Sequence, residues 1–182
     1  MQRRDRERRS AGDRLDVILD ITRQLMSVTD LDALLQAMAE STATLLAADR
    51  ATIFVVDRVR QELWSRVALG ATDIRTPIGV GIAGTVAANG KTINIRDAYE
   101  DPRFNPEHDQ ESGYRTKSLI TFPMKGNGGH VIGVFQVMNK RGGGPFTETD
   151  EQTLSSLASS AAVAIENAQL VSEQKRLWLS LI

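Results

Sequence analysis

The chain contains no cysteine. This absence excludes disulfides, thiolate catalysis, zinc–cysteine sites and cysteine-linked chromophores, and it fits a reducing compartment. The sequence also lacks an apolar run of the ~18 residues that a membrane span needs. Its charged start, MQRRDRERRS, leads into no signal-peptide core. We therefore expect a cytoplasmic protein with no membrane span.

An excess of charge of one sign is missing as well, because the formal net charge is -1. The chain therefore has no overall basic field that would attract nucleic acid. Residues 1–12 carry five arginines, with Asp5 and Glu7 between them and no aromatic residue. We interpret them as a charged N-terminal extension and expect no nucleic-acid partner.

Catalytic motifs are absent too. The sequence holds no Ser-His-Asp signature, no Walker loop and no metalloprotease helix. His108 and His130 are the only histidines, and no residue near them has the spacing of a zinc or iron site. We therefore expect neither a catalytic residue nor a metal, and a binding or regulatory domain fits better than an enzyme.

The periodicity of hydrophobic residues predicts the helices and strands, and from them the fold class. Apolar residues at helical spacing predict amphipathic helices over 13–28 and 31–46, and a capping box at Thr147 and Asp150 predicts a long helix from Glu148 to the last residue. A short helix is expected over Ile82–Asn89. Six stretches are alternating or β-branched and predict strands: Ala51–Val56, Glu62–Leu69, Ile74–Ile78, Thr92–Ile95, Ser118–Met124 and Val131–Asn139.

This order of elements predicts an α+β domain: an antiparallel sheet of about six strands, with the terminal helices packed on one face. The glycine-rich residues 125–130 suit a hairpin turn between the last two strands. Arg96–Lys117 is a long polar segment, expected to be a loop, and loops of that length in a compact domain are usually functional or disordered.

Gly79–Gly84 is formally a G-x-G-x-x-G motif. A Rossmann fold is a poor explanation, because the following helix is too short for a crossover and no βαβ series follows. Two interpretations stay open. Backbone N–H groups at Ile82–Gly84 would bind a phosphate or carboxylate at the helix end, or the glycines serve the turn geometry alone.

Several motifs together resemble the GAF domain family. Asn139-Lys140, Phe146 and Asp150-Glu151 are similar to the Asn-Lys…Phe…Asp-Glu signature of cyclic-nucleotide-binding GAF domains. The resemblance covers roughly residues 30–170. In kind it is similar to the GAF domains of bacterial nucleotide cyclases and mammalian cyclic-nucleotide phosphodiesterases. It implies a GAF domain over 13–170, with ligand-pocket loops on the sheet face opposite the terminal helices, and a signalling-helix extension over 171–182 toward a downstream domain.

The resemblance also implies roles for single residues. Lys140 and Asp150 would pair as a structural brace that does not touch the ligand. Ligand contacts would come from the strands, the short helix and the polar segment: Thr52, Arg66, Ile82, Ala83, Asp109, Tyr114, Thr116 and Gln136. Guanine-selective relatives place an aromatic residue and an acid where this chain has Ala68 and Leu69, and Gln136 stands where an acid can occur. This departure argues against cGMP. It leaves three possibilities open: cAMP, another small ligand, or no ligand at all.

Two functions follow from these expectations. The first is a sensory domain that binds a small ligand and controls an attached output domain, which we expect to be a nucleotide cyclase or a phosphohydrolase. The alternative is a ligand-free dimerisation and signal-relay module. Both predict a homodimer through the terminal helices, because Leu177, Trp178, Leu181 and Ile182 extend an apolar stripe beyond the domain. GAF-fold methionine-sulfoxide reductases need cysteine, which this chain lacks.

Overall fold

The computed structural model describes residues 28–69 and 73–182. The charged extension over 1–12 and nearly all of the helix predicted over 13–28 therefore lie outside the described residues. Six strands form one sheet: β1 Ala48–Asp57, β2 Glu62–Ala68, β3 Arg75–Pro77, β4 Ile93–Ile95, β5 Leu119–Lys125 and β6 Val131–Lys140. Their order is β3-β2-β1-β6-β5-β4, and all neighbours pair antiparallel. The predicted antiparallel sheet is confirmed.

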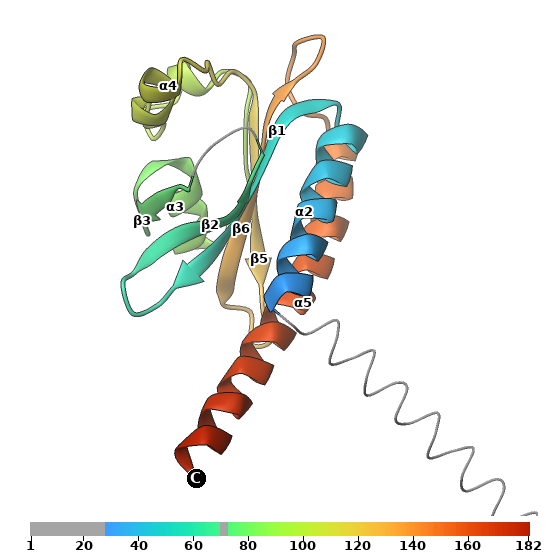
Figure 1. Ribbon diagram of the computed structural model, residues 1–182. Coiled ribbons are helices and arrows are strands. Elements are labelled where there is room, and N and C mark those ends of the chain that lie inside the picture. Colours follow the sequence, from blue (N-terminus) through green and yellow to red (C-terminus); the bar gives the residue numbers. More distant parts are fainter. Residues whose placement is uncertain (1–27, 70–72) are drawn as a thin grey trace, which may run out of the picture.

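Two helices cover one face of the sheet (Figure 1). These are α2, Val28–Leu45, and α5, Glu148–Ser180, which contact each other as well as the strands. The main hydrophobic core fills the space between them and the sheet, and its fully buried members include Leu35, Ile53, Phe135, Leu154 and Ile165. Burial of these side chains is the main force that fixes the two helices to this face.

The opposite face carries three short helices (Figure 1): α3 Gly81–Asn89, the 3-10 turn η1 Ala98–Glu100, and α4 Glu107–Ser112. A second hydrophobic cluster, which includes Phe54, Ile82, Val86 and Leu119, anchors α3 to the sheet. The expectation of a plain loop over Arg96–Lys117 was wrong, since η1 and α4 lie within it. We call residues 96–117 the lid.

The long helix α5 begins with the predicted capping box. The hydroxyl of Thr147 accepts a hydrogen bond from the backbone N–H of Asp150, and the Asp150 carboxylate accepts one from the N–H of Thr147. Ile165 is the last buried residue of α5, and beyond it the helix projects away from the sheet (Figure 1). Among the described residues no helix has the length and apolar character that crossing a membrane requires.

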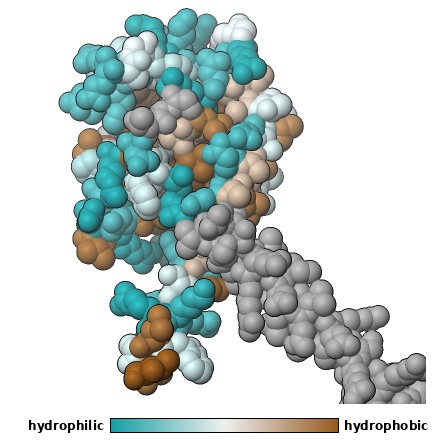
Figure 2. Space-filling view, in the orientation of Figure 1, coloured by the Kyte–Doolittle hydropathy of each residue, from teal (hydrophilic) through white to brown (hydrophobic). Residues whose placement is uncertain are grey.

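The projecting end of α5 carries exposed hydrophobic side chains, visible in Figure 2. Leu177 and Trp178 are 60% and 73% exposed, and Leu179, Leu181 and Ile182 are exposed further still. An exposed apolar surface of this kind is typical of an interaction site.

Candidate ligand-binding cavity

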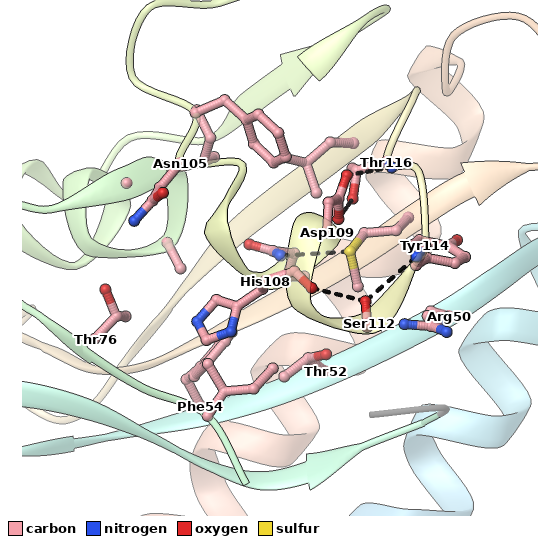
Figure 3. A pocket seen from close by; sticks show the side chains of 18 of the residues that line it. Arg50, Thr52, Phe54, Thr76, Asn105, His108, Asp109, Ser112, Tyr114 and Thr116 are labelled. Atoms are coloured by element: carbon pink, nitrogen blue, oxygen red, sulfur yellow. Dashed lines mark hydrogen bonds between the residues drawn. The ribbon is translucent and has the colours of Figure 1, made fainter. Parts of the chain in front are cut away.

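A cavity of about 680 Å³ lies between the sheet, α3 and the lid. Figure 3 shows how strand and lid side chains converge on it. The volume falls within the ~300–1,000 Å³ range of small-molecule sites. It is lined by Arg50, Thr52, Phe54, Ile74, Thr76, Val80, Gly81, Ile82, Ala83, Phe104, Asn105, His108, Asp109, Glu111, Ser112, Tyr114, Thr116, Leu119, Gln136 and Met138.

The sheet supplies the floor of this cavity. Thr52 of β1 and Gln136 of β6 are direct partners in the antiparallel register, which places their side chains next to each other on the cavity face. The Gln136 amide makes only long contacts within the protein: its oxygen accepts from the Thr121 hydroxyl at 3.3 Å, and its nitrogen lies 3.7 Å from the sulfur of Met138. An amide offers two donors and an acceptor, so Gln136 keeps hydrogen-bonding capacity for a ligand.

The first turn of α3 forms a second wall. Gly81, Ile82 and Ala83 line the cavity, no acidic residue occurs in this turn, and Val80 at the N-cap makes no side-chain capping bond. Uncapped N–H groups at a helix start attract anions. The glycines also serve the geometry: Gly81 has φ +69°, and a Cβ on Gly84 would lie 2.6 Å from the carbonyl oxygen of Pro77. The turn-geometry interpretation therefore holds, and it is compatible with anion binding.

Asp109 and Thr116 of the lid are bonded mainly to other lid residues. Asp109 is only 7% exposed, and its carboxylate accepts hydrogen bonds from the Tyr99 hydroxyl at 2.9 Å, the Thr116 N–H at 2.7 Å and the Thr116 hydroxyl at 2.8 Å. Both residues line the cavity. Their polar groups are thus largely used within the lid.

Tyr114 joins the lid to the sheet. The guanidinium carbon of Arg50 lies 3.6 Å from the centroid of the Tyr114 ring, a close cation–π contact between β1 and the lid (Figure 3). Burial, together with the nearby Asp49 carboxylate, raises the pKa of Tyr114 to about 12, so the phenol is neutral at physiological pH. The Asn139 side chain lies close enough to the Tyr114 hydroxyl to lower this pKa slightly, but the buried hydroxyl oxygen makes no hydrogen bond of normal geometry among the described residues. A buried hydroxyl of this kind calls for a partner such as a ligand or a water.

The structure places Arg66 away from the cavity. Its guanidinium donates to the Asp32 carboxylate of α2 at 2.7 Å, on the helix-covered face. A β-bulge is the reason: Ile53 pairs with Val67 while Phe54 pairs with Ser65, so Arg66 is the extra residue on β2. Strict alternation would have put Arg66 on the face of Ala68, which pairs with the cavity residue Thr52.

The signature residues lie together behind the cavity. Lys140 donates to the Asp150 carboxylate across the Gly142–Gly144 turn. Burial is the largest single influence and opposes ionisation of Asp150. The hydrogen bonds from Lys140 and Thr147 and the Lys140 charge together outweigh it, so the pKa of Asp150 is lowered. Phe146 is buried against the main core, and Glu151 lies half-buried in the first turn of α5.

Asn139 of the same signature holds the base of the lid. It has φ +57°, a backbone conformation that asparagine tolerates better than most residues. Its side-chain amide donates to the carbonyl of Arg115 at 2.8 Å and accepts from the N–H of Lys117 at 2.6 Å. These two bonds connect the last residues of the lid to β6.

The structure thus brings seven of the eight predicted ligand contacts to one cavity, all except Arg66. Other residues that line the cavity were not predicted. Phe54 lies two residues after Thr52 within the predicted strand, so strand periodicity alone could have found it. Arg50 lies two residues before Thr52 on β1, but outside the strand predicted from Ala51. His108, Glu111 and Ser112 carried no such signal, because they depend on the fold of the lid.

Comparison with known proteins places these features in a family. The sequence matches the GAF domain family over residues 30–165. It is 35% identical over 187 residues to the dual 3′,5′-cyclic-AMP and -GMP phosphodiesterase 11 of Drosophila melanogaster, covering 93% of this chain and 13% of that protein. It is 34% identical to phosphodiesterase 11A of Takifugu rubripes, covering 88% of this chain and 19% of that protein. The chain therefore spans only a small part of these relatives.

Solved structures agree on the fold. The GAF domain from a phosphoenolpyruvate-protein phosphotransferase of Coxiella burnetii superposes with a TM-score of 0.73 at 22% identity, covering 87% of this chain and 96% of that one. A free methionine-R-sulfoxide reductase from Neisseria meningitidis gives 0.67 at 24% identity, covering 83% and 87%. The expected fold and regulatory class are confirmed: the chain belongs to the GAF domain family, and what it shares with the two phosphodiesterases is their regulatory GAF domain and not their catalytic domain.

Proposed function

We propose that this GAF domain binds a cyclic nucleotide in the cavity, with cAMP preferred to cGMP, and that binding controls an output domain joined to α5. One observation carries the proposal. The cavity places the uncapped first turn of α3 opposite a sheet floor whose Thr52 and Gln136 side chains retain hydrogen-bonding capacity. An anion-binding end and a polar floor in one enclosure suit a ligand that has both a phosphate and a base.

The phosphate belongs at α3 in this proposal. The N–H groups of Ile82 and Ala83 are free of side-chain caps, and the helix dipole favours negative charge there. The Arg50 guanidinium adds positive charge to the cavity wall and is held in place by its stacking on Tyr114. Arg50 takes part in no ion pair among the described residues.

The base belongs at the floor. Glutamine reads adenine well, because its amide donates and accepts at the two adjacent positions of the adenine edge. Guanine instead presents N–H donors, and a carboxylate is the best acceptor for their hydrogen bonds. The two acids of the cavity do not meet that need: Asp109 already accepts three hydrogen bonds, and Glu111 is exposed on α4. This contrast supports cAMP ahead of cGMP.

The relatives support the rest of the proposal. Both are named as dual phosphodiesterases of cyclic AMP and cyclic GMP. We infer that the parent protein is a cytoplasmic phosphodiesterase or nucleotide cyclase, that it is a homodimer through its terminal helices, and that α5 links the cavity to the output domain. The exposed apolar end of α5 is the feature that supports both the pairing and the linkage.

Native mass spectrometry tests the proposal. The protein is measured as isolated from cells and again with added cAMP, cGMP or 5′-AMP. We expect one cyclic nucleotide per protomer, a lower half-saturation concentration for cAMP than for cGMP, and little binding of 5′-AMP. Absence of a nucleotide adduct at every concentration up to about millimolar, where the binding free energy is only ~4 kcal/mol, would rule the proposal out.

A further inference from the structure

Asp109 stands out in the cavity because its carboxylate is buried and yet has no cationic partner among the ion pairs of the described residues. A buried charge is costly unless hydrogen bonds compensate it. Here three donors do so. One oxygen accepts from the Tyr99 hydroxyl and the Thr116 N–H, and the other accepts from the Thr116 hydroxyl.

These donors come from separate parts of the lid. Tyr99 belongs to η1, ten residues before Asp109, and Thr116 lies seven residues after it, just before β5. The carboxylate therefore joins the start, the middle and the end of the lid at one point. Two contacts of the Tyr99 ring also stabilise this part of the lid. The ring centroids of Tyr99 and Phe104 are 5.1 Å apart, and the guanidinium carbon of Arg115 lies 4.4 Å from the Tyr99 centroid.

The same bonds argue against a direct ligand contact by Asp109. A carboxylate has about four acceptor positions, and three of them are used. A contact with the ligand that broke one of these bonds would leave a buried lid donor unpaired, which is costly. The negative charge of a cyclic phosphate would also repel the carboxylate.

We propose that Asp109 is a positioning residue that holds the lid in its folded form over the cavity before any ligand arrives. The claim about the lid concerns the protein alone. The consequence for nucleotide binding rests on the function proposed above. Two measurements on ligand-free protein and one of nucleotide kinetics keep the claims apart.

The first measurement is amide hydrogen exchange across the lid in ligand-free protein. Replacing Asp109→Ala removes the acceptor of all three bonds, so we expect the Thr116 amide and its lid neighbours to exchange about tenfold faster or more. Gln110→Ala is the matched control, since Gln110 is the exposed neighbour on α4 and lies outside the cavity lining. Asp109→Asn keeps one oxygen acceptor and should fall between the wild type and Asp109→Ala. It also replaces the alanine variant if that one does not fold.

Tyrosine absorbance gives a second ligand-free readout, because Tyr99 and Tyr114 are the only tyrosines. Burial first, and then the hydrogen bond to Asp109, raises the pKa of Tyr99. An alkaline titration should therefore show one tyrosine ionising earlier in Asp109→Asn than in the wild type. Unchanged lid exchange together with an unchanged tyrosine titration would overturn the proposal.

Nucleotide kinetics separate positioning from contact. If Asp109 only orders the lid, Asp109→Asn accelerates both association and dissociation of cAMP, because the cavity opens more often. If Asp109 touches the ligand, dissociation alone accelerates, and the positioning role is wrong. If no nucleotide binds to the wild type, the function proposed above fails while the exchange and absorbance results still decide the lid proposal.

Discussion

The Lys140–Asp150 brace permits a prediction with a definite size. Asp150→Ala removes a carboxylate that accepts from the Lys140 ammonium and from the Thr147 N–H, the latter at 2.8 Å. Hydrogen bonds to charged groups contribute ~1.5–3 kcal/mol each, and loss of a buried pair partner costs ~3–5 kcal/mol. The Lys140 side chain is 23% exposed, so water recovers part of its solvation. We therefore expect a loss of about 3 kcal/mol, near the lower end of that range.

Thermal and urea unfolding measure this loss. For a domain of this size about 3 kcal/mol lowers the Tm by ~6–12 °C. Asp49→Ala is the matched control, because Asp49 pairs with Arg141 at 3.5 Å and their side chains are 47% and 71% exposed. An exposed pair of this kind contributes under about 1 kcal/mol. The reasoning is refuted if Asp150→Ala lowers the Tm no more than Asp49→Ala does.

A double-mutant cycle separates the ion pair from the helix cap. Lys140→Met removes the ammonium and leaves the capping bonds between Asp150 and Thr147 in place. We expect a coupling energy of about 1–3 kcal/mol between positions 140 and 150. A coupling near zero would assign the loss in Asp150→Ala to the cap alone.

Three further predictions concern pH, specificity and assembly. The pKa of folded Asp150 lies below its ordinary value of 3.8, so the stability that this carboxylate supplies is complete above about pH 4 and is lost as pH falls through the folded-state pKa. The difference in unfolding free energy between wild type and Asp150→Ala should therefore narrow below about pH 4. A difference that stays constant with pH would contradict this. Gln136→Glu should weaken cAMP binding ~5- to 150-fold in a competition assay and shift the preference toward cGMP. The control Gln152→Glu, on the exposed face of α5, should change neither the affinity nor the preference. Equal effects of the two substitutions would show that Gln136 does not contact the base. Light scattering should give a dimer mass at roughly tens of micromolar and a monomer mass after truncation beyond Ala168, since the truncation removes the exposed apolar end of α5; a monomer in both cases would count against the dimer.

The strands and long helices were predictable because their side chains repeat with a clear period. The structure shifts most of their boundaries by only one or a few residues, and the three-residue shift at the start of β1 has a physical cause. Strand β1 begins at Ala48 and not at Ala51, because Ala48 and Arg50 already pair with β6 although Asp49 and Arg50 are polar. Taking the polar pair as a strand boundary hid Arg50, which is the sheet's contact to Tyr114.

The lid was not predictable from local patterns. The α4 helix has six residues, and its composition is polar. An isolated helix of that length is not stable in water, so this one depends on tertiary bonds such as those of Asp109. The bulge at Arg66 was hidden for a similar reason. A register shift between β1 and β2 leaves no mark in the alternating sequence, yet it turns Arg66 toward Asp32 of α2.

Calorimetric titration of cAMP tests the central claim most directly. The wild type should bind one cAMP per protomer with measurable heat. Arg50→Ala should weaken that binding about tenfold, the loss expected from one desolvated cation contact. Arg58→Ala, in the β1–β2 turn outside the cavity lining, should bind like the wild type. No heat with cAMP or cGMP at about millimolar concentration, or equal binding by Arg50→Ala and Arg58→Ala, would contradict a cyclic-nucleotide site in this cavity.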